Sequence, residues 1–339
     1  MIFLVDLEAL EKRYTSQWRK WFCDWFENNN YRYELVSGID REFKQGEFLD
    51  ICRTNLYKSE QVGHIARLFD EKKVKHNDVF YFFDGWHYGI TATKYMADLL
   101  GFKIKIVSYW HAGSYDPYDF ITQKGLRNWA SPGELSWMLA CDKILVATQF
   151  HKDLILKGFP NWGSYDLDYK IHVVGFPYNT EDLKIYKSAY SEYKKNIVVF
   201  PHRISSEKQP EVFDKLAEKF KGRAYKFIKA TEVTDTKKEY FELLAKSKVV
   251  FSANLQETFG IGTMEAVMLG CLPIVPDRLC YPELYDKKFL YDKGTDLSSM
   301  IVDFIPNYKK HTNSNEYINT IEKLKEVTNI DRILQEVII

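Results

Sequence analysis

Two glutamates, Glu257 and Glu265, stand on either side of a glycine-bearing turn within the stretch ANLQETFGIGTMEAVMLG (253–270). An apolar run precedes the turn and a helix-like segment follows it, so we expect the turn at a helix N-terminus. Exposed N–H groups and the helix dipole favour an anion there, typically a phosphate. Gly260 and Gly262 let a ligand approach the backbone closely. The two carboxylates need hydrogen-bond donors instead, and sugar hydroxyls are suitable ones.

A ligand with a sugar, a phosphate and a ribose satisfies all three features, so the motif predicts a nucleotide sugar. The residues by themselves also allow a plainer interpretation. Glu265 would then only improve the electrostatics of the first helical turn, and Glu257 would lie in solvent. Two cations, Arg203 and Lys208, occur in FPHRISSEKQPEVF (200–213), about 50 residues before the acidic pair. Taken alone, these two cations would usually be solvated side chains of a loop.

ETFGIGTMEA (257–266) resembles the paired-glutamate signature of retaining glycosyltransferases of the GT-B fold, family 4 type. Arg203 and Lys208 resemble that family's Arg–Lys element, and residues 197–295 are most similar to the tRNA-queuosine mannosyltransferase-like group. The resemblance implies a front-side transfer in which the leaving phosphate helps to take the proton. It implies catalytic roles for His111, Glu257, Arg203 and Lys208. It implies a donor site made of Arg203, Lys208, Thr258, Phe259, Gly260, Ile261, Gly262, Thr263 and Glu265.

The first half of the chain is less similar to that family. It has YWHAGSYDP (109–117) where the group carries a histidine after a strand, but EKRYTSQW (11–18) replaces the usual glycine-rich first turn. His111 is expected to touch the transferred sugar, or alternatively to bond local backbone at a strand end. Asp116 could equally cap a turn. The residues expected to contact the acceptor are Arg13, Tyr14, Trp86, His87, Tyr115 and Asp116.

Short apolar runs alternate with amphipathic segments along the whole chain, which predicts parallel sheets covered on both faces. The expected strands are 2–6, 78–85, 103–111, 143–149, 170–177, 197–203, 224–230, 249–254 and 272–276. The expected helices are 15–28, 59–72, 89–101, 210–222, 237–247, 262–270 and 315–328. We therefore expect an α/β chain of the GT-B type, with two Rossmann-like doubly wound domains facing a central cleft. The domains are expected at 1–180 and 190–314, with a helix in 315–339 crossing back onto the first.

The bulk composition excludes several classes of protein. Lys plus Arg and Asp plus Glu both number 47, so no global basic field attracts nucleic acid or a membrane. The five cysteines form no C-x-x-C pair, and no metal site is expected. The acid pair in DLD (166–168) lies in the wrong context for a metal. With no signal peptide and no apolar span, we expect a cytoplasmic protein that is a monomer or weak dimer.

The acceptor and the donor nucleotide are the open questions. We expect a UDP-sugar rather than a GDP-sugar as co-substrate, without a further cofactor or metal. Compact length and Lys-, Asn- and Tyr-rich usage favour a phage enzyme that glycosylates 5-hydroxymethylcytosine in DNA, with queuosine in tRNA as the alternative. The neutral charge keeps a lipid or polysaccharide acceptor open. A sugar-nucleotide binding protein without transfer activity is the alternative of a different class.

Overall fold

The structure is a computed structural model that describes residues 1–8, 14–41, 50–159 and 166–338. Its contacts divide the chain into two compact units. Unit 1 comprises Met1–Ala147, His151–Pro177 and Ile330–Ile339, and unit 2 comprises Thr148–Phe150 and Tyr178–Asn329. Each unit is described by itself below.

Unit 1 is built on a six-stranded sheet in the order β2-β1-β3-β4-β5-β6, with every described pairing parallel. Its central strands carry β-branched and aromatic residues that are buried on both faces, as a parallel sheet between helices requires. The strands are β1 (Ile2–Val5), β2 (Tyr33–Val36), β3 (Val79–Phe82), β4 (Lys105–Tyr109), β5 (Lys143–Val146) and β6 (Ile171–Val173).

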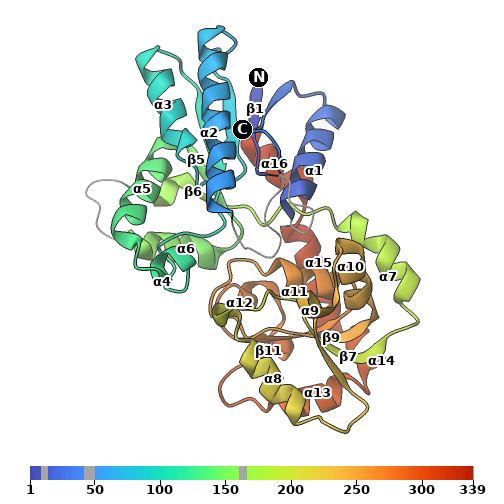
Figure 1. The fold of residues 1–339 in the computed structure, drawn as a ribbon. Helices are drawn as coiled ribbons and strands as arrows, with labels where there is room; N and C mark the ends of the chain where they lie inside the picture. Colours follow the sequence, from blue (N-terminus) through green and yellow to red (C-terminus); the bar gives the residue numbers. More distant parts are fainter. Residues whose placement is uncertain (9–13, 42–49, 160–165, 339) are drawn as a thin grey trace. The chain divides into compact units, whose positions relative to one another are not determined.

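Helices cover both faces of this sheet (Figure 1). On one face the core joins Phe80, Phe82 and Ile106 of the strands to Ile65 and Leu135 of the helices. On the other face α1 packs beside α16, where the Trp25 indole N–H donates to Asp331 at 2.6 Å. The helices are α1 (Tyr14–Asn28), α2 (Ile51–Asp70), α3 (Gly89–Leu99), α4 (Phe120–Gln123), α5 (Arg127–Ala140), α6 (Gln149–Gly158) and α16 (Ile330–Ile338).

Unit 2 repeats the same plan with a five-stranded parallel sheet in the order β11-β10-β9-β7-β8. The strands are β7 (Lys195–Phe200), β8 (Lys226–Lys229), β9 (Ser247–Phe251), β10 (Leu272–Pro276) and β11 (Leu290–Tyr291). In both units the first strand lies between the second and the third. The chain therefore reverses its winding direction at β1/β3 in unit 1 and at β7/β9 in unit 2. Ligands of doubly wound sheets bind beside such reversal points, at the carboxyl ends of the strands.

The helices of unit 2 are amphipathic or buried according to their place around the sheet. The best-formed N-terminus belongs to α10, where Thr236 and Glu239 make a capping box. The helices are α7 (Lys184–Tyr190), α8 (Pro210–Glu218), α9 (Ala230–Val233), α10 (Lys237–Lys246), α11 (Ile261–Met268), α12 (Tyr281–Leu284), α13 (Leu297–Phe304), α14 (Tyr308–Thr312) and α15 (Asn315–Val327). Short 3₁₀ turns lie at Asp168–Lys170 in unit 1 and at Thr180–Leu183, Ser206–Lys208 and Lys287–Phe289 in unit 2.

The C-terminal crossing differs from the expectation for 315–339. Two helices occupy that stretch: α15 belongs to unit 2, and only α16 belongs to unit 1. The break falls at Thr328, whose hydroxyl bonds back to the Leu324 carbonyl at 2.7 Å and whose own carbonyl accepts the Tyr178 N–H. Two of the points at which the chain passes between units, 177/178 and 329/330, therefore lie side by side.

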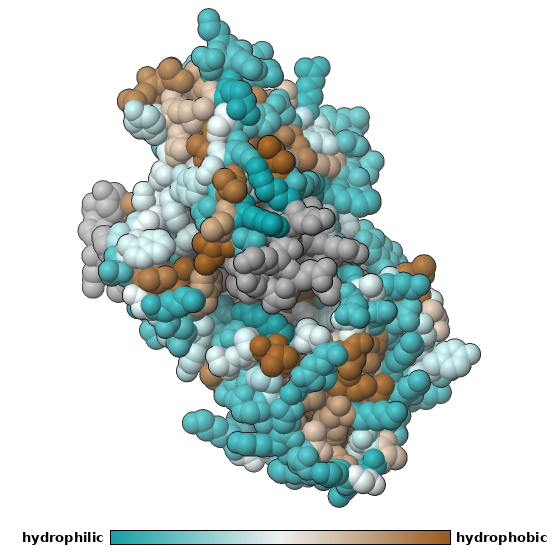
Figure 2. Space-filling view, in the orientation of Figure 1, coloured by the Kyte–Doolittle hydropathy of each residue, from teal (hydrophilic) through white to brown (hydrophobic). Residues whose placement is uncertain are grey.

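The surface shows no single dominant apolar area on the drawn face (Figure 2), where hydrophobic residues form small groups among polar ones. Within the described part of the chain, no helix combines the length and the apolar character needed to span a bilayer.

Candidate active site

The predicted donor residues come together at the β7/β9 reversal point of unit 2. Pro201, His202 and Arg203 follow the end of β7, and the loop from Ser252 to Gly260 follows the end of β9, which is the neighbouring strand. Parallel strands end at the same edge of a sheet, so both loops meet there. This is the place where the topology predicts a ligand.

Lys208 and Glu257 form an ion pair in this cluster, with Nζ and Oε2 3.2 Å apart. The Lys208 ammonium also donates to the Gln256 carbonyl at 2.6 Å. Gln209, directly after it, takes the left-handed conformation with φ of 52° and directs the chain into α8. Burial would raise the pKa of Glu257, but the Lys208 ammonium and nearby donors outweigh it, so the pKa lies below its usual value. Glu257 is therefore an ionised acceptor at neutral pH.

Arg203 has a different partner from the one expected. Its guanidinium donates to Glu207 Oε1 from Nε at 3.0 Å and from a terminal nitrogen at 2.6 Å. Its side chain is 41% exposed, so this pair is screened by water and contributes little stability. Arg203 lies at the right edge for a phosphate contact, but it would have to exchange Glu207 for the phosphate.

The turn before α11 has the geometry of an anion site. Gly260 has φ of 83°, a conformation that favours glycine, and its N–H bonds the Glu257 carboxylate. Gly262 is also constrained by packing. A Cβ there would meet the Tyr240 hydroxyl at 3.0 Å and Pro201 at 3.3 Å, so its small size serves packing within unit 2. Of the remaining predicted donor residues, Phe259 is buried and Thr258 and Ile261 are half-buried.

Three buried polar atoms around this turn have no hydrogen-bond partner within the described chain. They are His202 Nε2, Asn254 Oδ1 and Thr263 Oγ1. Burial lowers the pKa of His202 to about 3, so its ring is neutral. Buried polar groups in folded proteins are nearly always paired, so these three atoms call for partners that ordered water or a ligand would supply.

Glu265 lies one turn further along α11 and is 2% exposed. Its Oε1 accepts from the Tyr178 hydroxyl at 2.8 Å and from Lys237 Nζ at 3.1 Å, and the Tyr240 hydroxyl also bonds it. Neither Lys237 nor Tyr178 was predicted for this site. Their separations from Glu265 follow no motif spacing, and only the fold brings them to α11.

A third residue that was not predicted from the sequence, Arg278, organises the loop that carries Glu257. It donates to the carbonyls of Asn254 at 3.0 Å and Ala253 at 2.8 Å. Leu279 beside it has φ of 60°, which is strained for a leucine. The loop that carries Glu257 is thus held by the Arg278 side chain rather than by regular secondary structure. The sequence DRL (277–279) contains no recognisable motif that predicts this role.

The predicted residues of unit 1 occupy a separate edge, at the ends of β3 and β4. His111 Nε2 donates to the Phe83 carbonyl at 2.9 Å, which leaves Nδ1 as the acceptor of the Tyr14 hydroxyl at 3.2 Å. Burial lowers the pKa of His111, so the ring is neutral. Both ring nitrogens are engaged, as in the alternative of a histidine bonded to local backbone. A contact with the transferred sugar would need one of these bonds to break.

Three of the predicted acceptor contacts are buried instead of lying at an accessible rim. His87 accepts the Gly89 N–H at 2.9 Å and bonds Gln61 at 3.0 Å, so it organises the start of α3, and burial lowers its pKa to about 3. Tyr115 lies in the core with its hydroxyl 2.7 Å from His151 Nε2. Asp116 accepts the Tyr118 N–H at 2.8 Å, which is the turn-capping alternative.

The acceptor candidates Trp86 and Arg13 differ from these three buried residues. Trp86 is half-buried, and its indole N–H donates to Glu134 at 2.8 Å. Arg13 lies outside the described residues. Of the six acceptor candidates, Tyr14 and Trp86 are therefore the described ones that keep partial exposure.

Comparison with known proteins supports the architecture. No protein-family model matches the chain. The Drosophila melanogaster tRNA-queuosine alpha-mannosyltransferase is 27% identical over 214 residues, which are 50% of this chain and 57% of the fly protein. The chain thus matches little more than half the length of that relative.

Solved structures match over nearly the whole chain. Sucrose-phosphate synthase from Thermosynechococcus elongatus has a TM-score of 0.66 at 10% identity and covers 99% of this chain and 96% of its own. The Anabaena protein HepE in complex with UDP has a TM-score of 0.60 at 12% identity, covering 99% and 98%. An alpha-glucosyltransferase in complex with UDP-glucose and DNA has a TM-score of 0.57 at 16% identity, covering 99% and 97%. The chain has the GT-B fold, with two Rossmann-like α/β domains.

Proposed function

We propose that this chain is a glycosyltransferase that moves a hexose from a nucleotide sugar to an acceptor hydroxyl. The observation that carries the proposal is the group of three unpaired buried polar atoms around the N-terminus of α11. They belong to His202, Asn254 and Thr263, at the β7/β9 reversal point. The fly mannosyltransferase supports the same reaction class at the level of sequence.

The cluster supplies what the breaking of a sugar–phosphate bond requires. The N–H groups at the start of α11 would receive the diphosphate, and Lys208 would neutralise the charge that develops on the leaving group. Glu257, already ionised, would accept hydrogen bonds from the sugar hydroxyls. Glu265 would accept hydrogen bonds from the ribose hydroxyls in exchange for one of its present donors, Tyr178, Lys237 or Tyr240. Arg203 would join the phosphate on exchanging Glu207, an exposed partner that is easily released.

We also propose that the transfer retains the configuration of the sugar and that the donor is a UDP-sugar. In a retaining transfer the acceptor hydroxyl attacks from the side of the leaving phosphate, and that phosphate takes the proton. This scheme asks for no protein nucleophile, no metal and no further cofactor. We propose a UDP-sugar before a GDP-sugar as donor.

For the acceptor, we now place queuosine in tRNA before 5-hydroxymethylcytosine in DNA. The supporting observation is the sequence similarity to a tRNA-queuosine alpha-mannosyltransferase over half of this chain. The relative bound to DNA is similar in fold at 16% identity, which favours no particular acceptor. DNA remains the second candidate.

One experiment tests the donor and the acceptor together. Purified protein is incubated with UDP-glucose, UDP-galactose, GDP-mannose or UDP-N-acetylglucosamine, and release of the nucleoside diphosphate is measured. Parallel reactions contain queuosine tRNA, unmodified tRNA, hydroxymethylated DNA or unmodified DNA, and mass spectrometry detects an added hexose. We expect transfer to queuosine tRNA only. Binding of a nucleotide sugar without hydrolysis or transfer would identify a binding protein instead, and transfer to neither modified substrate would remove the nucleic-acid acceptor.

A further inference from the structure

The Glu265 carboxylate, which would bind the ribose of the donor, is covered by its own hydrogen-bond donors. The residue is only 2% exposed. Its donors are the Tyr178 hydroxyl at 2.8 Å, Lys237 Nζ at 3.1 Å and the Tyr240 hydroxyl, all of them in unit 2. Ribose hydroxyls can therefore reach this carboxylate only if one of the three donors moves away.

The two tyrosine donors are held in place by the packing around them. Tyr178 is buried, and its backbone N–H bonds the Thr328 carbonyl at 3.2 Å. The Tyr240 hydroxyl is packed against α11, since a Cβ added to Gly262 would lie 3.0 Å from it. Because the ring of a tyrosine has to turn before its hydroxyl can leave, displacing either one would disturb the close packing of unit 2.

Lys237 is a donor of a different kind. It is the first residue of α10, its side chain is 22% exposed, and its ammonium stands at the end of a flexible four-carbon stem. Nζ lies 4.9 Å from the ring centroid of Phe241 and 5.7 Å from that of Tyr240. Contacts of a cation with aromatic rings are weak at partly exposed sites. The ammonium can thus turn into water while both tyrosine rings stay where they are.

The hydroxyls of a ribose are suited to replace this ammonium. A ribose offers two neighbouring hydroxyls that can each donate a hydrogen bond to the carboxylate, whereas Lys237 donates to Oε1 alone. The ion pair that is given up is partly exposed, so water screens its attraction and solvates the released ammonium. A nucleotide without these hydroxyls would leave Lys237 on Glu265.

We propose that Lys237 is a specificity-determining residue of the donor site, which occupies the ribose position on Glu265 until the hydroxyls of a ribonucleotide displace it. The inference rests on the proposed function, because it requires a nucleotide at this site. Lys237 acts through Glu265 and takes no part in bond cleavage. Before the nucleotide binds, its ammonium keeps a buried carboxylate paired, and afterwards the cost of displacing it weakens the hold on the ribose.

Two nucleotides that differ only in these hydroxyls test the exchange. The unchanged chain, Lys237→Met and Lys237→Arg are titrated by calorimetry with UDP and with dideoxy-UDP, which lacks both ribose hydroxyls. Base and diphosphate are the same in the two ligands, so the ratio of their dissociation constants cancels any attraction between Lys237 and phosphate. We expect the preference for UDP to rise about threefold in Lys237→Met, because the hydroxyls no longer displace a screened ion pair. Lys237→Arg should keep the original preference.

Lys238→Met is the matched control, because Lys238 is the next residue of α10 and is exposed. It should leave the preference unchanged. A lower preference in Lys237→Met would show that Lys237 supports the ribose contact instead of occupying its place, and an unchanged preference would show that the two are not coupled. Either result overturns the inference. Thermal unfolding of each variant shows that it is folded.

The proposed function fails in a different way. Guanosine diphosphate and its dideoxy form are titrated in parallel, so that a guanosine donor gives the same comparison. A chain that binds neither diphosphate would contradict both the proposed function and the role of Lys237. A chain that binds one of them, without a rise in ribose preference in Lys237→Met, would contradict the role of Lys237 alone.

Discussion

An ion pair between Lys208 and Glu257 lies at the centre of the candidate donor site in unit 2. The approach of Lys208 to Glu257 follows from two loops that end neighbouring strands, and both residues were predicted for the site. The partners of Glu265 were not, because Lys237 and Tyr178 reach it only through the winding of unit 2. Residues within a motif are predictable, and residues that the fold brings to the motif are not.

Removing the Lys208 ammonium should affect turnover more than folding. We expect Lys208→Ala to lower kcat by ~10²-fold, since one cation on the leaving group accounts for several kcal/mol of transition-state stabilisation. Glu257→Ala should have a similar effect through the sugar. Steady-state kinetics with the nucleotide sugar that the proposed screen selects measure both. Lys215→Ala, an exposed lysine in α8, is the control and should keep wild-type turnover. An unchanged kcat in Lys208→Ala would refute its role.

At the scale of elements, alternation of strands and helices in the sequence predicted two doubly wound sheets, and the structure has them. Elements that depart from this alternation were harder to predict from the sequence. Strand β2 (YELV) is only half-buried, and the polar start of α2 lacks an apolar stripe, so neither shows the expected periodicity. Helix α5 was not predicted because it contains Pro132, and proline usually interrupts a helix. Buried polar contacts, not apolar periodicity, specify these elements.

Replacing Gly260 in the turn before α11 should weaken ligand binding as well as strain the backbone. Gly260→Ala places a Cβ on a backbone with φ of 83°, at a cost of about 1 kcal/mol. Gly222→Ala is matched to it, with φ of 80° and nothing within 4 Å of the new Cβ. Urea unfolding should show similar losses of stability for both. Calorimetry should show weaker UDP binding for Gly260→Ala alone, and equal UDP affinity in the two variants would argue against an anion site at this turn.

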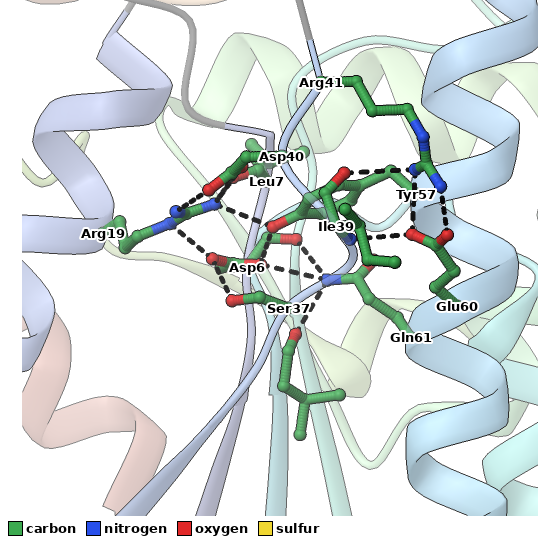
Figure 3. A network of polar contacts seen from close by, with 11 residues as sticks. Asp6, Leu7, Arg19, Ser37, Ile39, Asp40, Arg41, Tyr57, Glu60 and Gln61 are labelled. Atoms are coloured by element: carbon green, nitrogen blue, oxygen red, sulfur yellow. Dashed lines mark hydrogen bonds and ion pairs between the residues drawn. The ribbon is translucent and has the colours of Figure 1, made fainter.

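Asp6, directly after β1, joins several elements of unit 1 (Figure 3). It pairs with Arg19 Nε at 2.6 Å and accepts from the Tyr57 hydroxyl at 2.6 Å, from Ser37 at 2.8 Å and from Gln61 at 3.1 Å. These partners come from α1, α2 and the residue after β2, so Asp6 fastens those elements to β1.

The junction around Asp6 should make unit 1 less stable as the pH rises from about 4 to 6. Burial raises the pKa of Asp6 to about 6 from 3.8, against the opposing pull of Arg19 and the hydroxyl donors. The folded state then binds more protons than the unfolded state across that window, so the free energy of unfolding falls by about 3 kcal/mol as the pH rises. Below the window Asp6 is protonated in both states, and above it the loss is complete.

Asp6→Asn should remove this slope while adding a constant loss from the unpaired Arg19. Urea unfolding followed by tryptophan fluorescence at several pH values compares the variant with the unchanged chain. A difference in stability that does not vary between pH 4 and 7 would show that Asp6 has no raised pKa.

At the scale of the whole molecule, the two units differ in their tryptophan content. All eight tryptophans occur at or before position 162, and the described ones belong to unit 1, so their fluorescence reports that unit. Unit 2 contributes to far-ultraviolet circular dichroism without a tryptophan signal. The two probes therefore separate the unfolding of the units.

Deleting 330–339 should destabilise unit 1 selectively. Ile333, Leu334 and Val337 of α16 are buried, and Asp331 bonds Trp25, so their loss exposes apolar surface worth several kcal/mol. We expect the fluorescence transition to move to lower urea while a second transition, seen by circular dichroism, stays in place. A shift of both transitions together would show that the units unfold as one.

The return of α16 to unit 1 also sets an order of events during synthesis. A chain leaving the ribosome acquires every strand of unit 2 before the helix that closes the α1 face of unit 1 has been translated. Unit 1 therefore remains incomplete, with part of its apolar surface exposed, until the chain has been synthesised past unit 2. A chaperone that shields this surface would have to act on the nascent chain until residues 330–338 have been translated.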